Sequence, residues 1–224
     1  MCGRYYRRSD KQWISEHFRV RGNLPDFVPD HNIAPTTFQP VIRLDRETGE
    51  RELATMRWGL VPHFAKDLRD FRMNTINAKA EALMTSAMWR LPFTRRRCLV
   101  PADGFYEWRK LDEKTKQPYA FAMKNGDPFA FAGIWTRWME KDGKPLESYA
   151  IITTDPNELA ASVHNRMPVI LKPQDYERWL TCDDTLPPPL DLLRPYDADA
   201  TTMWEAHKDV GNVKNNRVEL LNSA

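Results

Sequence analysis

The sequence has few cysteines, no long apolar run and almost no net charge. Its 224 residues include 3 cysteines (Cys2, Cys98 and Cys182), and 33 Lys+Arg against 31 Asp+Glu leave a formal charge of +2. An odd number of cysteines without a CxxC pair argues against both a disulfide framework and a zinc site. No apolar stretch approaches the ~20 residues that span a bilayer, and the charged start of the chain is unlike a secretory signal.

These absences, together with 42% hydrophobic and 29% charged residues, are typical of an ordinary soluble globular protein. The sequence also shows no internal repeat and no low-complexity linker. We therefore expect a single domain over residues 1–224, monomeric and cytoplasmic (nucleoid-associated if bacterial), with no membrane contact, no metal and no cofactor.

Positive charge is concentrated in the first half of the chain. Residues 1–100 hold 18 Lys+Arg and 11 Asp+Glu, a sum of +7, and the remainder holds 15 and 20, a sum of −5. Arg95-Arg96-Arg97 is the densest point. Such a half can offer a face for phosphates, although a solvated surface run has the same composition, and charge alone favours that plainer reading.

Apolar patterning predicts many strands and few helices. Helices are expected at 10–18 (capped by Ser9), at 78–86, from 155–158 to about 163, and at 173–180, and strands at 41–44, 53–58, 98–100, 105–108 and 148–154. Because Asn125-Gly126 suits a type I′ turn, 119–123 and 129–136 are predicted to form a hairpin. Residues 24–40 are proline-rich and expected to be irregular. The pattern favours an α+β fold built mainly on antiparallel sheet.

Cys2 follows the initiator methionine, and it is small enough for that methionine to be excised. The mature chain would then begin with an α-amine and a thiol on adjacent carbons, which titrate near ~7.7–8.0 and ~8.5. Such a residue can condense with an aldehyde to an imine and close a thiazolidine ring intramolecularly. Position alone still favours the alternative that Cys2 is merely a small inert residue.

Seven short motifs along the chain change that balance. They are, in order, Met1-Cys2-Gly3-Arg4, Asn32-Ile33-Ala34-Pro35, Trp58-Gly59-Leu60-Val61-Pro62, Asn77-Ala78-Lys79-Ala80-Glu81, the run 101–108 (PADGFYEW), the run 164–171 (HNRMPVIL) and Gly211-Asn212-Val213-Lys214-Asn215. The series resembles the SRAP (SOS-response-associated peptidase) family over nearly the whole chain. The resemblance implies a barrel-like core with peripheral helices.

The resemblance also implies a function. Proteins of this family form a covalent thiazolidine with the ring-opened aldehyde of an abasic site in single-stranded DNA, which shields the lesion from strand cleavage. Carried onto this chain, Cys2 is the nucleophile after autoproteolytic removal of Met1, and Asn77 positions it. Glu107 shuttles protons, and His164 assists imine chemistry and its reversal in a lyase-like step. Taken alone, Asn77 could equally cap a helix, Glu107 could be an exposed strand residue and His164 a structural one.

DNA contacts are expected from cations and aromatics within or beside these motifs. Arg4, Lys79 and Arg166 could meet the phosphates that flank the lesion. Trp58 and Trp108 could stack on bases, although Trp58 is equally compatible with a place in the core.

Three other functions share some of these features. A glutamine amidotransferase with an N-terminal nucleophile also begins with a cysteine exposed by methionine removal. A cysteine peptidase could use Cys2, His164 and Asn77. A non-covalent single-stranded DNA-binding module would bind in a salt-sensitive way and ignore the abasic site.

Overall fold

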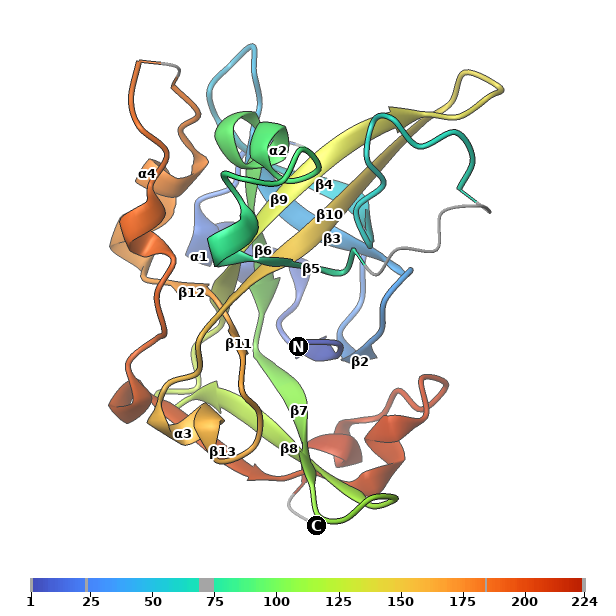
Figure 1. Ribbon diagram of the computed structural model, residues 1–224, viewed down its shortest axis with the longest axis vertical. Helices are drawn as coiled ribbons and strands as arrows, with labels where there is room; N and C mark the ends of the chain where they lie inside the picture. The colour runs from blue at the N-terminus through green and yellow to red at the C-terminus, as the bar shows by residue number, and fades with distance from the viewer. Residues whose placement is uncertain (1, 23, 69–74, 184, 223–224) are drawn as a thin grey trace.

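The computed structural model describes residues 2–22, 24–68, 75–183 and 185–222 (Figure 1). The helices are α1 (Lys11–Phe18), α2 (Arg90–Arg95), α3 (Glu158–Ala161) and α4 (Tyr176–Leu180). The strands are β1 (Tyr5–Arg7), β2 (Asp30–Ile33), β3 (Phe38–Leu44), β4 (Arg51–Trp58), β5 (Asn77–Lys79), β6 (Arg97–Ala102), β7 (Gly104–Lys110), β8 (Lys116–Met123), β9 (Phe129–Met139), β10 (Pro145–Thr154), β11 (Met167–Pro168), β12 (Ile170–Leu171) and β13 (Thr201–Glu205). Strands dominate and the helices are short, so the predicted α+β class is confirmed.

Five of the long strands close on themselves. The order of hydrogen-bonded neighbours is β10-β4-β3-β6-β9, and β9 pairs again with β10 along the register Pro145↔Met139 to Ile151↔Gly133. All these pairings are antiparallel except that of β10 with β4. The result is a five-stranded ring in the upper half of Figure 1, which confirms the barrel-like core.

A second sheet of order β13-β8-β7-β1-β2 lies beside the ring, and its strands β7, β8 and β13 occupy the lower half of Figure 1. The chain crosses between the two sheets where β6 ends at Ala102 and β7 begins at Gly104. The buried Asp103 stabilises this crossing because its carboxylate accepts hydrogen bonds from the backbone N–H groups of Arg8 and Ser9 and from the Ser9 hydroxyl.

Alternation along the strands divides the apolar side chains between two clusters. Leu99 and Ile152 pack in one cluster with residues of α1 and α4, such as Phe18 and Trp179, and so lie on the outer face of the ring. Side chains of the opposite parity therefore point into the ring, where they join residues of the second sheet. This inner cluster includes Cys2, Tyr5, Val41, Met56, Trp58, Val100, Phe121, Phe131, Tyr149 and Ile151.

The predicted hairpin of 119–123 with 129–136 is wrong, although both strands and the turn exist. Gly126 has a φ of 77° and its N–H donates to the Met123 carbonyl at 3.0 Å. However, β8 pairs with β7 and β13, whereas β9 pairs with β6, β10 and β12. The turn carries the chain from one sheet to the other, because turn chemistry fixes a local reversal and not the partners of the strands.

The predicted helix at 78–86 is also wrong. Asn77–Lys79 forms the short strand β5, parallel to Ile151–Thr153 of β10, and only a 3-10 turn follows at Ala80–Ala82. Asn77 is therefore not a helix cap. Here backbone pairing with β10 overrides a composition that favours helix.

Most other predicted elements are present, with shifted ends. Asp10 rather than Ser9 caps α1, since its carboxylate accepts from the Trp13 N–H at 2.8 Å. The helix predicted from 155–158 begins only at Glu158, with Asn157 as its cap. Residues 24–40, expected to be irregular, contain β2 and the start of β3.

Candidate functional site

Cys2 lies just before β1 and is fully buried in the chain that still carries Met1. The pairing of β1 with β7 continues toward the N-terminus beyond Tyr5, because the Tyr106 N–H donates to the Arg4 carbonyl at 2.9 Å. This register brings the start of the chain alongside Glu107. Burial raises the pKa of the Cys2 thiol, and the negative charge of Glu107 raises it further. The thiol is therefore held in its protonated form in this state.

Glu107 projects from β7 with 4% of its surface exposed. Its strand neighbours Tyr106 and Trp108 pack instead with Tyr6 on the other face of the sheet, as alternation predicts. Burial raises the pKa of the Glu107 carboxyl, and the positive charge that His164 can carry opposes this rise. Glu107 thus interacts electrostatically with both Cys2 and His164.

His164 follows α3 and precedes β11. The backbone N–H of Arg166 donates to its Nδ1 at 3.0 Å. The Arg166 carbonyl oxygen lies 3.2 Å from the same nitrogen, so the role of Nδ1 depends on the tautomer; in the tautomer in which Nδ1 accepts from the Arg166 N–H, the proton of the neutral ring is on Nε2. The imidazole can therefore offer a proton from Nε2 while its orientation is fixed through Nδ1.

Asn77 lies on β5, opposite Ile151 of β10. Its Nδ2 donates to the Ile151 carbonyl at 3.4 Å, while its Oδ1 is buried and has no hydrogen-bond partner among the described residues. Leaving a buried amide oxygen unpaired costs about 1–3 kcal/mol. The oxygen is suited to accept a hydrogen bond from an added donor such as an amine.

Arg4 and Asn32 form a network that sequence analysis did not foresee. The Arg4 Nη1 donates to the Asn32 Oδ1 at 2.8 Å and to the Val210 carbonyl at 3.1 Å. The Asn32 Nδ2 in turn lies within hydrogen-bond distance of the carbonyls of Val210, Asn212 and Asn215. The available signal was the pair of motifs at 32–35 and 211–215, whose spacing says nothing about contact. Arg4, which was predicted to contact DNA, thus donates two hydrogen bonds within the protein.

The other two predicted phosphate contacts differ from each other. The Arg166 guanidinium is mostly buried and bonded to Glu81, Asp155 and the Thr153 carbonyl at 2.7–3.0 Å. Lys79 lies opposite Thr153 in the pairing of β5 with β10 and is exposed. Of the three cations, only Lys79 offers an exposed side chain.

Trp58 belongs to the core. It has no exposed surface, its Nε1 donates to the Ile76 carbonyl at 3.0 Å, and its ring packs edge-on against Tyr5 and stacks with Tyr149. The structure thus supports the core alternative for Trp58 and offers no face to a base. Trp108 is half-buried beside the Tyr6 cluster.

Two tyrosine hydroxyls also lie in the cluster that contains Cys2. Tyr5 Oη and Tyr149 Oη are 2.8 Å apart, and both side chains are fully buried. Sequence analysis missed this pair, because Tyr149 is marked only as part of the predicted strand 148–154 and Tyr5 lies in no predicted element. The pair satisfies two buried hydroxyls within the cluster that contains Cys2.

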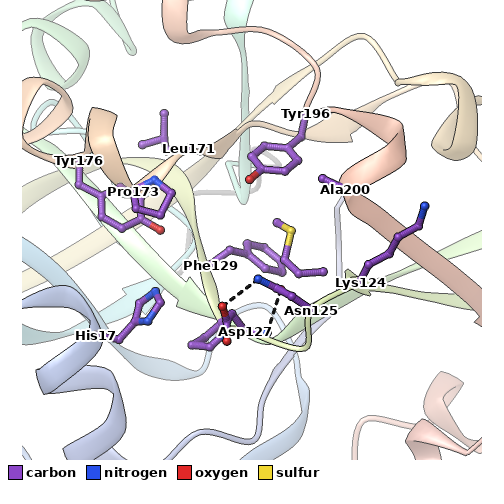
Figure 2. Close-up of a pocket in the computed structure, with 12 residues that line it drawn as sticks. His17, Lys124, Asn125, Asp127, Phe129, Leu171, Pro173, Tyr176, Tyr196 and Ala200 are labelled. Atoms are coloured by element: carbon purple, nitrogen blue, oxygen red, sulfur yellow. Dashed lines mark hydrogen bonds between the residues drawn. The ribbon is translucent and has the colours of Figure 1, made fainter.

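A hollow elsewhere in the molecule contains none of the predicted site residues. It has a volume of about 310 Å³ and is lined by His17, Phe129, Tyr176 and Tyr196 among others (Figure 2). In the part of the chain that the structure describes, no three His, Cys, Asp or Glu side chains are grouped to hold a metal ion. No helix within the described ranges is long and apolar enough to cross a membrane.

Comparison with known proteins gives consistent results. The family model described as SOS response associated peptidase (SRAP) matches residues 1–213. The chain is 40% identical to the abasic site processing protein YoqW of Bacillus subtilis, over the full length of both. It is 31% identical to the abasic site processing protein HMCES of Gallus gallus, over 96% of this chain and 70% of that protein. A crystal structure of a Bacteroides thetaiotaomicron protein shares the fold, with a TM-score of 0.88 at 24% identity over both whole chains.

Proposed function

Because this chain belongs to the SOS response associated peptidase (SRAP) family, we propose that it processes abasic sites in single-stranded DNA by becoming covalently attached to them through Cys2. Two of its relatives are named abasic site processing proteins. The observation that carries the proposal is the pairing of β1 with β7, by which the buried Cys2 lies alongside the strand that carries the buried Glu107. The negative charge of Glu107 adds to the burial that raises the pKa of the Cys2 thiol.

The proposed reaction begins with hydrolysis of the Met1–Cys2 peptide bond, which consumes one water and frees the Cys2 α-amine. The amine attacks the aldehyde of the ring-opened abasic sugar, and the carbinolamine loses one water to give an imine. The Cys2 sulfur then adds to the imine carbon while the thiol proton is transferred to the nitrogen. The product is a thiazolidine, and DNA joins mature protein with the net loss of one water.

Glu107 is the proposed proton shuttle for these steps. A carboxyl whose pKa is raised by burial can carry a proton closer to neutral pH than an exposed carboxyl can. It can therefore protonate the leaving water of the carbinolamine and accept the thiol proton of Cys2. Removal of Met1 by the same groups is the family's peptidase-type step, and we propose it for this chain.

Asn77 and His164 are the proposed positioning residue and second acid–base group. The unpartnered Asn77 Oδ1 can accept a hydrogen bond from the freed α-amine without adding charge. The His164 Nε2–H can donate to the sugar oxygen as the ring opens. Lys79, which is exposed beside Asn77, is the proposed phosphate contact nearest to these groups.

A direct test is to incubate the protein with a single-stranded oligonucleotide that carries one abasic site. We expect a species that survives denaturing electrophoresis, with a mass equal to DNA plus protein lacking Met1, less one water. Cys2→Ala should abolish it. Cys98→Ala is the matched control, because Cys98 is equally buried but lies within the chain and so carries no α-amine, and it should retain the crosslink.

The same experiment separates the alternatives. An N-terminal extension that blocks processing should behave like Cys2→Ala, and normal crosslinking by the extended protein would refute the α-amine mechanism. Hydrolysis of glutamine to glutamate would indicate an amidotransferase. Cleavage of unrelated peptides would indicate a general peptidase. Salt-sensitive binding of DNA without a stable adduct would leave only a binding module.

A further inference from the structure

An arginine side chain closes the ring of strands at the end remote from Trp58. Arg43 has the same strand parity as Val41 and so points into the ring, where its guanidinium bonds to Glu52 at 2.6 Å and to Glu147 at 2.9 Å. The guanidinium carbon also lies 4.4 Å from the centre of the Trp135 ring. Along β4, Glu52 and Trp58 are six residues apart, or roughly 20 Å.

Around this closure lies a hollow of about 420 Å³, which we term the arginine hollow. It is lined chiefly by Arg43, Arg46, Arg95, Arg96, Arg97 and Trp135. A neighbouring hollow of about 250 Å³ shares Arg43, Arg46 and Arg96 and extends to Arg137. The two together form a track of arginines and not a single-ion pocket.

Of the four carboxylates that line these hollows, Glu47 is exposed on the surface and the other three are already bonded. Glu52 and Glu147 both pair with Arg43. Asp45 accepts from the N–H groups of Glu47 and Thr48 and from the Thr48 hydroxyl within its own turn. The local positive charge is therefore only partly neutralised inside the protein.

Three of the arginines have no salt bridge to any described residue. Arg46 and Arg137 are exposed, and Arg96 is half-buried with its guanidinium carbon 5.3 Å from the centre of the Trp135 ring. Burial and then the charge of Arg46 lower the pKa of Arg96, and Arg137 and Arg43 add to the effect against the opposing charge of Glu147. Holding like charges this close is unfavourable unless an anion joins them.

We propose that the arginine hollow binds the phosphate backbone of a DNA strand that continues away from the lesion, an inference that rests on the proposed function. Guanidinium groups bind phosphate oxygens in pairs and stack on aromatic rings. Arg96 lies over the Trp135 ring and shares the hollow with the exposed Arg46. Of the basic run, Arg95 and Arg96 line this hollow with partly or fully exposed side chains, whereas Arg97 is buried and donates to the carbonyls of Phe93, Trp179 and Thr181.

The test is equilibrium binding of an undamaged single-stranded 20-mer at several salt concentrations, which needs no covalent step. We expect Arg46→Gln/Arg96→Gln to weaken binding on the order of tenfold near 0.15 M salt. The slope of log affinity against log salt should fall by about 1.4, since each lost phosphate contact removes about 0.7. Lys114→Gln/Lys116→Gln removes the same charge from exposed positions of the second sheet and should bind like the wild type.

Equal affinity and slope for Arg46→Gln/Arg96→Gln and the wild type would overturn the proposal, as would an equal loss in the lysine control. If Arg96→Gln impairs folding, Arg46→Gln/Arg137→Gln replaces it, because both side chains are exposed. Cys2→Ala distinguishes the two proposals. It should lose the crosslink to abasic DNA yet keep the salt-dependent affinity for the 20-mer, so failure of one leaves the other standing.

Discussion

The Asn32 side chain links the strand that begins near Cys2 to the C-terminal segment, and Asn32→Ala should break that link. The side chain is 4% exposed. Its Oδ1 accepts from the charged Arg4, and its two amide hydrogens serve the carbonyls of Val210, Asn212 and Asn215. A bond to a charged group contributes about 2 kcal/mol and each neutral bond about 1 kcal/mol, so we expect a loss of about 4 kcal/mol.

Urea unfolding followed by tryptophan fluorescence would measure this loss as a shift of the midpoint at constant slope. The exposed Asn125→Ala is the matched control, because its amide bonds only within its own turn to Asp127, and it should change stability by less than about 0.5 kcal/mol. A loss below about 1 kcal/mol for Asn32→Ala would refute the reasoning. It would mean that water replaces the amide, and that Arg4 is free to turn toward DNA.

Three further predictions concern substitutions of single residues. Burial raises the pKa of the Glu107 carboxyl above its ordinary 4.5. Between the unfolded and the folded pKa the folded chain binds the extra proton, so the stability of the wild type falls as pH rises through that window. Glu107→Gln should lack this fall in pH-dependent urea unfolding, and it should crosslink about 10²–10⁴-fold more slowly, as expected for loss of an acid–base group. Trp58→Ala should cost about 4 kcal/mol in the same unfolding assay, as for other buried aromatics. Gly104→Ala should lower the melting temperature measured by circular dichroism, because the added Cβ would collide with the Tyr6 hydroxyl and the Phe121 carbonyl. An unchanged melting temperature would mean that β7 shifts freely to accommodate the Cβ.

Local patterns predicted the strands better than their partners. Alternating apolar residues indicated 53–58 and 148–154 because each strand buries one or both faces, and β4 and β10 occupy these places. The patterns could not show that β10 runs parallel to β4 and β5 and also closes the ring against β9. Pairing between distant segments depends on packing throughout the core, and a short stretch of sequence carries no information about its distant partners.

The site could be assigned from the sequence only through the resemblance. Cys2, Asn77, Glu107 and His164 come from four separate segments, and no periodicity relates residue 77 to residue 164. In the fold, β10 pairs with β5, which carries Asn77, on one side and with β11, which follows His164, on the other, while β7 carries Glu107 alongside the start of β1. The chemistry of Cys2 as an aminothiol, in contrast, could be argued from its position alone.

For arginines, more than for any other residue type, the sequence did not distinguish a structural role from a DNA-binding role. Arg4 and Arg166 lie in the reactive motifs, yet Arg4 donates through Nη1 to Asn32 and the Val210 carbonyl, and the Nη atoms of Arg166 donate to two carboxylates and a carbonyl. Arg46 and Arg96 lie in no motif, yet they make no salt bridge to the described residues and crowd other arginines. A buried guanidinium needs partners wherever it lies, so a motif arginine can be retained to hold the reactive segments in place. Arg46 and Arg96 lie among other arginines without such internal partners, so binding of an external anion is the simpler explanation for their presence.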